Sequence, residues 1–485
     1  MLARDFIDDS LYNPNYGYFP KQAVIFDPGA ALVQKQEGAE GHGSLTVQDP
    51  EELKRRRLHG FDFSKMRNNA DWDRTVAETY GIIEEAHEGS GPGRQVWHTP
   101  TELFKPYYAQ AVANHLATEY KLALYPYNDL KIFEIGAGNG SMMTGVLDYL
   151  RDAEPEVYKR THYHTIEISQ QLADLQLARA KAAGHSARVS TVRQSIFDWN
   201  QVVTDPCFFL AFEVLDNLSH DVVRYTLEDE TPLQCLVEID ERGDFSEVYE
   251  PVSDPLIQRF LNIRRDIRRH NPFAHSTLHP IIARSPLLRK IYASMPFAPN
   301  LSPPDFLPTQ SLMLLDVLRN KFPAHRILMS DFDELPDTIP GRMAPVVQTR
   351  YEGQSVTCST YLVSQGWFDI FFPTDFRFLR DMYEWVMAGK DKTHARHNHN
   401  HHIQWGTGST ALAGPEQQLQ QQGMSENEMR RIAEIGVGLG WGNRKPLRVL
   451  SHRQFLERYG EPEYTMLKDG TNPMLDLYEN ADFIY

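Results

Sequence analysis

The chain has 485 residues, 24% charged and 41% hydrophobic, which is typical of a soluble globular protein with two or three domains. Its 65 acidic and 49 basic side chains give a formal charge of -16. This argues against a general binder of nucleic acid or anionic membranes, because such binding depends on Lys and Arg. Three scattered cysteines without a C-x-x-C pair argue against a disulfide framework and a thiolate zinc site.

Targeting and membrane signals are not visible in the sequence. No run approaches the roughly 18 apolar residues of a membrane span, so we expect none. The first residues, Met1 to Phe6, show neither a signal-peptide core nor an Arg/Ser-rich amphipathic stretch. The compartment is therefore not read from this end of the chain.

Composition shifts divide the chain into five expected segments. They are an N-terminal helix and turn packed on the core at 1–27, a polar, partly disordered insertion at 28–96, a core with the candidate site at 97–240, a helical insertion at 241–308, and the remaining core strands with C-terminal helices at 309–485. The last segment contains a His/Gln-rich loop at 392–423.

Secondary-structure patterns predict alternating strands and helices. Short apolar strands are expected at 131–135, 163–168 and 207–212, separated by helical patterns, which predicts parallel βαβ winding. An Arg- and Leu-rich helical block at 255–295 shows no strand signal. Further strands are expected at 326–329, 346–351, 359–363 and 368–372, and helices at 376–387, 426–435 and 453–459.

Two polar stretches admit a functional and a plain interpretation. The charge run from Glu51 to Arg57 fits a docking patch for an acidic partner, but an exposed helix face is favoured. The histidine cluster between His394 and His402 fits a metal site. Because it lies in a Gly/Asn/Gln-rich stretch without a carboxylate pair, we favour a solvent-exposed loop and predict no metal.

The strongest motif is a glycine-rich turn between an apolar strand and an amphipathic helix. Glu134 lies in the strand, and Gly136, Gly138 and Gly140 form a G-x-G-x-G turn before Ser141. Such glycines let a ligand approach closely, and the helix N-terminus offers unpaired N–H groups. A dinucleotide site has its third glycine at the position that Ser141 occupies. The spacing favours S-adenosylmethionine, with Glu134 facing its amino-acid end.

Acidic residues after the next strands fit the rest of this cofactor. Glu167 ends a strand, where a carboxylate can accept hydrogen bonds from both ribose hydroxyls; a surface carboxylate is the alternative. Asp198 follows Ile196 and Phe197, which we expect to pack on the adenine ring while Asp198 binds its amine. An N-capping Asp198 with core aromatics is an equal alternative.

The acceptor side is expected after the apolar strand that ends at Phe212. Glu213 and Asp216 lie three residues apart at the carboxyl end of this strand, where open α/β sheets bind substrates. A carboxylate pair can bind a guanidinium bidentately and localise its charge away from the attacking nitrogen. The remaining task is to align that nitrogen with the methyl group in a dry pocket. His220 would accept the released proton, unless it is structural.

These motifs resemble those of the MidA-type mitochondrial methyltransferases, in the same order over nearly the whole chain. The segments that match are 6–19 (opening helix and P-x-Y-G-Y-Y turn), 98–104 (T-x-P-E-I-S), 134–141 (E-I-G-x-G-x-G-x), 167–169 (V-E-x-S), 212–218 (N-E-x-x-D-A-L-P), 369–376 (D-I-T-x-x-V-D-F) and 452–456 (T-Q-x-x-F-L).

The resemblance implies a Rossmann-like class I S-adenosylmethionine-dependent methyltransferase with an inserted helical block and an extended C-terminal part. It implies a type II protein arginine methyltransferase in mitochondria that assists respiratory complex I assembly, with a protein substrate such as a complex I subunit. It also places Thr99, Glu102 and Ile168 beside the cofactor.

The chain departs from the family pattern mainly on the substrate side. In N-E-x-x-D-A-L-P, Phe212 replaces Asn, Asn217 replaces Ala and Ser219 replaces Pro. The segment from Ser330 to Asp333 stands where the family has Asp-Tyr-Gly. We therefore expect cofactor binding to carry over better than substrate choice.

Three other functions remain open at this point. The chain could be a methyltransferase relic that chaperones an assembly partner without turnover, and weak cofactor binding would favour this. A small-molecule methyltransferase acting on oxygen or carbon would need a closed apolar pocket. A dinucleotide oxidoreductase is disfavoured by Ser141 and by the lack of recognisable hydride-transfer residues.

Overall fold

The computed structural model describes residues 1–21, 24–25, 60–86, 96–97, 99–267, 280–295, 300–335, 343–351, 354–390 and 446–485. The charge run, the histidine cluster and the helix expected at 426–435 lie outside these residues. Among the described helices, none is both long and apolar enough to cross a membrane.

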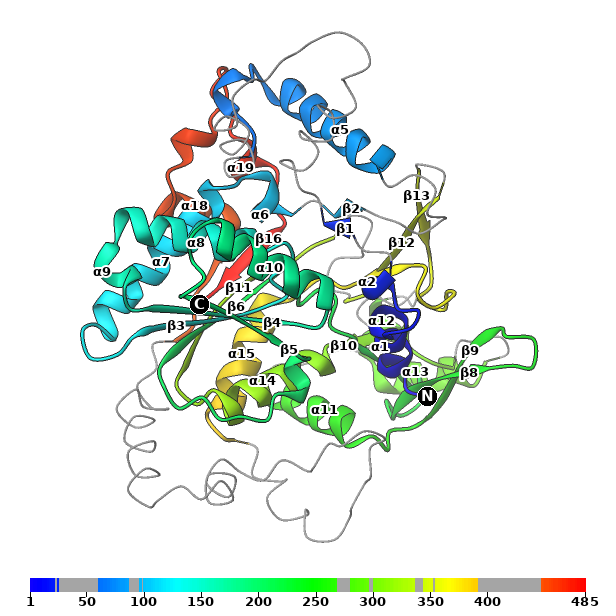
Figure 1. The fold of residues 1–485 in the computed structure, drawn as a ribbon. Helices are drawn as coiled ribbons and strands as arrows, with labels where there is room; N and C mark the ends of the chain where they lie inside the picture. The colour runs from blue at the N-terminus through cyan, green and yellow to red at the C-terminus, as the bar shows by residue number, and fades with distance from the viewer. Residues whose placement is uncertain are drawn as a thin grey trace, which may run out of the picture.

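A seven-stranded sheet forms the centre of the molecule and confirms the predicted Rossmann-like α/β fold (Figure 1). Its strands are β3 (Leu130–Ile135), β4 (Thr161–Glu167), β5 (Val189–Arg193), β6 (Cys207–Phe212), β11 (His325–Phe332), β15 (Val449–Ser451) and β16 (Ala481–Ile484). The spatial order is β15-β16-β11-β6-β3-β4-β5. The strand β16 is antiparallel to β15 and to β11, and all other neighbouring pairs are parallel. The order reverses between β3 and β6, which is where open α/β sheets bind ligands.

Helices cover both faces of this sheet (Figure 1). One face carries α7 (Tyr107–Ala123), α8 (Ser141–Ala153), α10 (Gln170–Ala182) and α18 (His452–Tyr459), and the other carries α14 (Thr309–Lys321) and α15 (Phe376–Met387). A short α9 (Pro155–Tyr158) follows α8. Every residue of β6 is buried, as its unbroken apolar run predicts for a central parallel strand.

A four-stranded antiparallel sheet begins in the expected core segment and extends into the segment 241–308, where only helices were expected. Its order is β10-β7-β8-β9, formed by β7 (Asp221–Tyr225), β8 (Pro232–Ile239), β9 (Phe245–Pro251) and β10 (Asp305–Leu307). The helices α11 (Pro255–Ile267), α12 (Pro280–Arg284) and α13 (Pro286–Ala293) follow β9. The sequence did not reveal these strands because β8 and β9 are only partly buried and carry polar residues.

A third sheet contains two of the strands that were expected to complete the central one. Its order is β13-β12-β14, with β12 (Val346–Tyr351), β13 (Gln354–Cys358) and β14 (Asp369–Phe371). The strand predicted at 359–363 is wrong, because these residues form bends and irregular chain after β13. The central sheet is instead completed by β15 and β16, whose three and four residues give little sequence signal.

Part of the polar insertion packs on the core. The 3-10 helix η2 (Phe63–Lys65) and α5 (Asn69–Ala86) lie in the described residues 60–86. Trp72 stacks on Phe63 and on Phe104, with ring centroids 5.3 and 5.4 Å apart. These few aromatic anchors lie within a polar stretch, which is why composition alone suggested a solvated segment. Short elements α2 (Tyr18–Lys21), β1 (Val24–Ile25), β2 (Val96–Trp97), η5 (Pro462–Thr465) and α19 (Pro473–Asp476) complete the fold.

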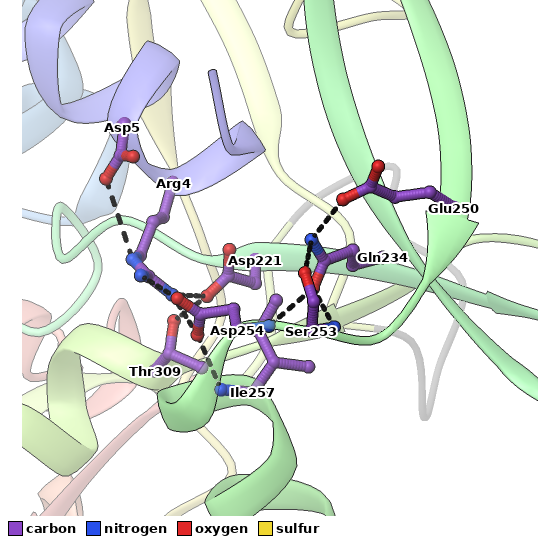
Figure 2. A network of polar contacts seen from close by, with 9 residues as sticks. All are labelled: Arg4, Asp5, Asp221, Gln234, Glu250, Ser253, Asp254, Ile257 and Thr309. Carbon is purple, nitrogen blue, oxygen red and sulfur yellow. Dashed lines mark hydrogen bonds and ion pairs between the residues drawn. The ribbon is translucent and has the colours of Figure 1, made fainter. Parts of the chain in front are cut away.

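The N-terminal helix α1 (Ala3–Tyr12) is fixed to the antiparallel sheet by a buried ion-pair network (Figure 2). Arg4 donates to Asp221 at 2.6 Å and to the two oxygens of Asp254 at 3.0 and 2.8 Å. Thr309 also donates to Asp221, at 2.7 Å. Because Asp221 is the first residue of β7, the network positions α1 against the loop that leads from β6 to β7.

Candidate functional site

The glycine turn connects β3 to α8 at the switch point. Gly136, Gly138 and Gly140 all have positive φ, of 65°, 49° and 78°, a conformation that favours glycine. A Cβ on Gly136 would lie 2.6 Å from Val214 Cγ2. Gly140 is the N-cap of α8, so the turn exposes the unpaired N–H groups of this helix beside β3.

The segment before α7, residues 99–105, forms hydrogen bonds that hold this turn in place. Thr99 caps α6 (Pro100–Leu103) by accepting from the N–H of Glu102 at 3.3 Å. The buried Glu102 carboxylate accepts from Ser141 Oγ at 2.7 Å and Asn139 Nδ2 at 3.2 Å, and pairs with Lys105 Nζ at 2.9 Å. Glu102 therefore contacts the glycine turn and fixes the shape of the loop, whereas Thr99 caps the short helix that carries Glu102. Contact of either residue with the cofactor stays a prediction.

Glu134 lies inside β3 and is buried. Its Oε2 accepts from the Tyr163 hydroxyl at 2.8 Å. Burial and, less strongly, the charge of Glu167 raise the pKa of Glu134 to about 8, so this carboxyl is mostly neutral at pH 7. A neutral carboxyl next to the turn can donate one hydrogen bond and accept others.

Glu167 lies at the carboxyl end of β4 and is linked to the glycine turn. Its Oε1 accepts from the N–H of Ser169 at 2.9 Å and its Oε2 from Gln176 Nε2 at 3.1 Å. Gln176 Nε2 also donates to the carbonyl of Gly138 at 2.9 Å. Each carboxylate oxygen can accept a second hydrogen bond, so Glu167 fits a ribose diol.

The residues expected around adenine lie at the ends of β4 and β5. Ile168 is 46% exposed, which leaves an apolar surface for a ring, whereas Ile196 is buried and Phe197 half-buried. Asp198 ends η3 (Ile196–Asp198) and is exposed. The cap of η3 is Ser195, so the alternative of an N-capping Asp198 is wrong. Contact of these residues with adenine stays a prediction.

Glu213 follows β6 directly and has φ 53°, which is uncommon for a residue other than glycine. Burial, together with the charges of Asp331 and Glu102, raises its pKa well above the usual range. The charge of Glu213 adds to burial in raising the pKa values of Tyr108 and Tyr478. Sequence reasoning missed these tyrosines because they come from α7 and from the segment before β16.

Asp331 fixes the conformation of the acceptor loop, residues 213–220. Its Oδ2 accepts from the N–H groups of Val214, Leu215 and Asp216 at 3.0, 2.8 and 3.2 Å. Burial nevertheless raises the pKa of Asp331 to about 6. Sequence reasoning could have found Asp331, because it lies at the carboxyl end of β11, and β11 ends at the same edge of the sheet as β6.

Asp216 lies among three other carboxylates and is 4% exposed. Burial, and then the charges of Asp331, Asp369 and Glu213, raise its pKa well above the usual range. Its Oδ1 has no hydrogen-bond partner among the described residues. In the same part of the chain, no basic side chain forms an ion pair with Asp216 or Glu213. The predicted pair is therefore brought together without a counter-ion.

His220 is buried and stacks on Phe372, with ring centroids 3.8 Å apart and planes at 8°. Its Nδ1 lies 2.8 Å from the carbonyl oxygen of Leu218 and donates to it. Burial lowers the pKa of His220 to about 3, which makes this ring a poor acceptor for a proton at pH 7. The structural alternative for His220 is therefore favoured over the proton-acceptor role.

Metal-binding geometry is not found in the described part of the chain, where no group of three His, Cys, Asp or Glu side chains could hold an ion. The residues at the glycine turn instead fit a nucleoside cofactor. They combine a left-handed turn, the open N-terminus of α8 and a strand-end carboxylate tied to the turn.

Comparison with known proteins identifies relatives and a family. The chain is 23% identical over 260 residues to the mitochondrial protein arginine methyltransferase NDUFAF7 homolog of Schizosaccharomyces pombe, covering 50% of this chain and 51% of that protein. It is 22% identical over 307 residues to the protein of the same name from Saccharomyces cerevisiae, covering 58% and 66%. The chain thus spans about half to two thirds of the length of these curated relatives.

A Burkholderia thailandensis protein solved with S-adenosyl-homocysteine is 14% identical, with a TM-score of 0.45 over 79% of this chain and 71% of that one. Residues 111–390, more than half of the chain, match the family described as "Putative S-adenosyl-L-methionine-dependent methyltransferase". The chain therefore belongs to this methyltransferase family, and its cofactor is S-adenosylmethionine.

Proposed function

We propose that this chain methylates a guanidinium nitrogen of an arginine in a protein, in mitochondria and in connection with the assembly of respiratory complex I. Two curated relatives are named mitochondrial protein arginine methyltransferases, which supports the acceptor and the compartment. The link to complex I comes from the family resemblance of the sequence motifs. A protein substrate fits the strongly acidic chain, because arginine-bearing segments are positively charged.

The observation that carries this proposal is the pair Glu213 and Asp216, which has no counter-ion among the residues that the structure describes. Burial and neighbouring carboxylates raise both pKa values, which disfavours the ionised forms of these carboxylates in the ligand-free site. A cation placed between the two carboxylates would offset this effect and favour their ionised forms. A guanidinium is a good match, because its planar donors can reach two carboxylates at once.

The chemistry requires little more than alignment. S-adenosylmethionine supplies an electrophilic methyl group on a sulfonium. Glu213 and Asp216 hold the guanidinium so that one nitrogen faces this methyl group, a bond forms between nitrogen and carbon, and the carbon–sulfur bond breaks with its electron pair going to sulfur. The methylated nitrogen then releases one proton. Since His220 is neutral and poorly basic, one of the two carboxylates takes this proton.

The test is transfer of a labelled methyl group to proteins of a mitochondrial extract, followed by identification of the modified residue. Glu213→Gln is expected to keep S-adenosylmethionine binding and to lose about 10- to 1,000-fold in methyl transfer, as for removal of a charged transition-state contact. Glu119→Gln is a matched control, because Glu119 lies on α7 and pairs with Arg326 of β11. Label on a residue other than arginine, or full turnover by Glu213→Gln, would refute the proposal.

A further inference from the structure

Asn217 is the point at which three segments meet in the acceptor loop. Its side-chain Nδ2 donates to Asp369 Oδ1 at 3.3 Å, and its backbone N–H donates to the carbonyl oxygen of Val214 at 3.3 Å. Its carbonyl oxygen accepts from the Tyr12 hydroxyl at 3.2 Å. The family motif has Ala at this position, and an alanine would make only the two backbone contacts.

Asp369 opens β14 and is completely buried. Its Oδ1 is bound by Asn217, whereas its Oδ2 has no hydrogen-bond partner among the described residues. Burial raises the pKa of Asp369 well above the usual range, and the hydrogen bonds from Ile370 and Asn217 oppose this shift. A buried carboxylate oxygen without a donor is costly, so this atom points to a ligand that is charged or that donates hydrogen bonds.

In the described part of the chain, no cationic side chain interacts with Asp369. Asp216 interacts electrostatically with Asp369, Asp331 and Glu213, so it connects Asp369 to the proposed acceptor pair. Tyr12, from α1, interacts with Asp216 and Asp369 and with Asp8 on its own helix. His220, from the same loop, is neutral. Apart from the neutral His220, the ionisable groups that interact with Asp369 in the described structure are therefore acidic.

We propose that Asp369 and Asn217 complete the acceptor site, with Asp369 as a third carboxylate and Asn217 as the positioning residue that orients it beside Asp216. This inference rests on the proposed function and extends it to the charge selectivity of the site. Glu213 and Asp216 contact the guanidinium, and Asp369 strengthens the negative potential behind Asp216. Asn217 acts through Asp369, because its amide donates a side-chain hydrogen bond that opposes the rise of the Asp369 pKa and so favours the ionised form of this carboxylate.

The consequence is a strong preference for a charged over a neutral acceptor. In this chain, the replacement of the family's Ala by Asn217 adds a donor at the point where a fully buried carboxylate needs one. A neutral isostere of arginine, such as citrulline, has similar shape but cannot compensate three carboxylates. Loss of either Asn217 or Asp369 should therefore reduce the preference for arginine over citrulline. It should have a smaller effect on the binding of S-adenosylhomocysteine, the product of the cofactor.

The test measures binding of N-acetylarginine methylamide and of its citrulline counterpart by calorimetry, with the full chain saturated with S-adenosylhomocysteine. Asn217→Ala should lower the preference for arginine about 3- to 10-fold, the value of one buried hydrogen bond, and Asp369→Asn about 10-fold. The double variant should lose no more than Asp369→Asn alone, because Asn217 acts through Asp369. S-adenosylhomocysteine affinity should stay within about twofold in each variant.

Asn114→Ala is the matched control. Asn114 Nδ2 donates to the backbone carbonyl of Tyr459 at 2.9 Å, so the variant also loses an amide hydrogen bond, but one from α7 to a neutral acceptor. It should keep the wild-type preference for arginine. Thermal melting of every variant separates a loss of fold from a loss of selectivity.

The outcomes separate this inference from the proposed function. If Glu213→Gln lowers the preference for arginine but Asn217→Ala and Asp369→Asn do not, the role of Asp369 and Asn217 is refuted and the proposed function stands. If the wild-type chain shows no preference for arginine, both fail. Additive losses in the double variant would contradict the action of Asn217 through Asp369.

Discussion

Replacement of Arg4 by methionine would remove the one cation of the buried network in Figure 2. Arg4 is 5% exposed and pairs with Asp221 and Asp254, whose side chains are 1% and 6% exposed. Arg4→Met would leave these two carboxylates buried without a counter-ion, although Asp221 would keep its bond from Thr309. Removing one partner of such a buried ion pair typically costs about 3–5 kcal/mol, because the remaining charge is uncompensated.

The cost should depend on pH in a defined direction. Burial raises the pKa of Asp221 to about 6 even beside Arg4, whereas an unfolded aspartate titrates near about 4. A raised folded pKa adds stability at low pH that is lost as the pH rises through this value. Without Arg4 the folded pKa rises further, and each unit costs about 1.4 kcal/mol at pH 8. Arg4→Met should therefore lose about 3–5 kcal/mol at pH 8 and clearly less at pH 5.

The assay is urea unfolding followed by tryptophan fluorescence at both pH values. Arg151→Met is the matched control, because Arg151 pairs with Asp148 and Asp152 while 41% exposed. Because solvent screens these exposed ion pairs, Arg151→Met should lower the free energy of unfolding by no more than about 1 kcal/mol at either pH. Equal losses for Arg4→Met at pH 5 and pH 8, or a loss at pH 8 as small as that of the control, would refute this account of the network.

Two further substitutions test the glycine turn and the α1 contact. Gly136→Ala should weaken S-adenosylhomocysteine binding about tenfold in calorimetry, because position 136 has φ 65° and a Cβ there would lie 2.6 Å from Val214. Gly184→Ala is the control, since position 184 has φ 82° but open space around it, and it should leave this affinity unchanged. Equal affinities of the two variants would contradict the role of the turn. Tyr12→Phe should lower the free energy of unfolding in urea by about 0.5–1.5 kcal/mol, because it loses the hydrogen bond to the acceptor loop. Tyr16→Phe, at an exposed position, should have a smaller effect. The reverse ranking would contradict a stabilising contact between Tyr12 and the loop.

The cofactor half of the site could be predicted because its signals are local. The glycine turn, β3 and the start of α8 are consecutive in sequence, and their backbone conformation depends on glycine itself. The apolar run of β6 was likewise sufficient to predict its bounds, because a strand buried on both faces needs no partner sequence to be recognised. Glu167 was placed correctly at its strand end for the same reason.

The acceptor half was only partly predictable because most of it is assembled by long-range pairing. Glu213 and Asp216 were found because they follow β6, but Asp331 reaches them through the register that pairs Ser330 with Phe212. Asp369 was noted only as part of a motif, and Tyr12 only as part of a turn. The sequence does not reveal which residues lie near Asp369 or Tyr12. Asp369 is in β14, which belongs to another sheet, and Tyr12 is in α1, whose position depends on the distant ion pairs of Arg4.

This division explains where the chain departs from the family pattern. The glycine turn contacts mainly its own segment and Glu102, so a substitution in the turn directly disturbs the part of the site that binds the cofactor. The acceptor loop, in contrast, is held from outside by the Asp331 carboxylate and by α1, which support its backbone whatever side chain stands at position 217. Asn217 can therefore replace the family's Ala without loss of the loop conformation. The substitution changes instead the environment of a buried carboxylate, and hence the charge that the acceptor must carry.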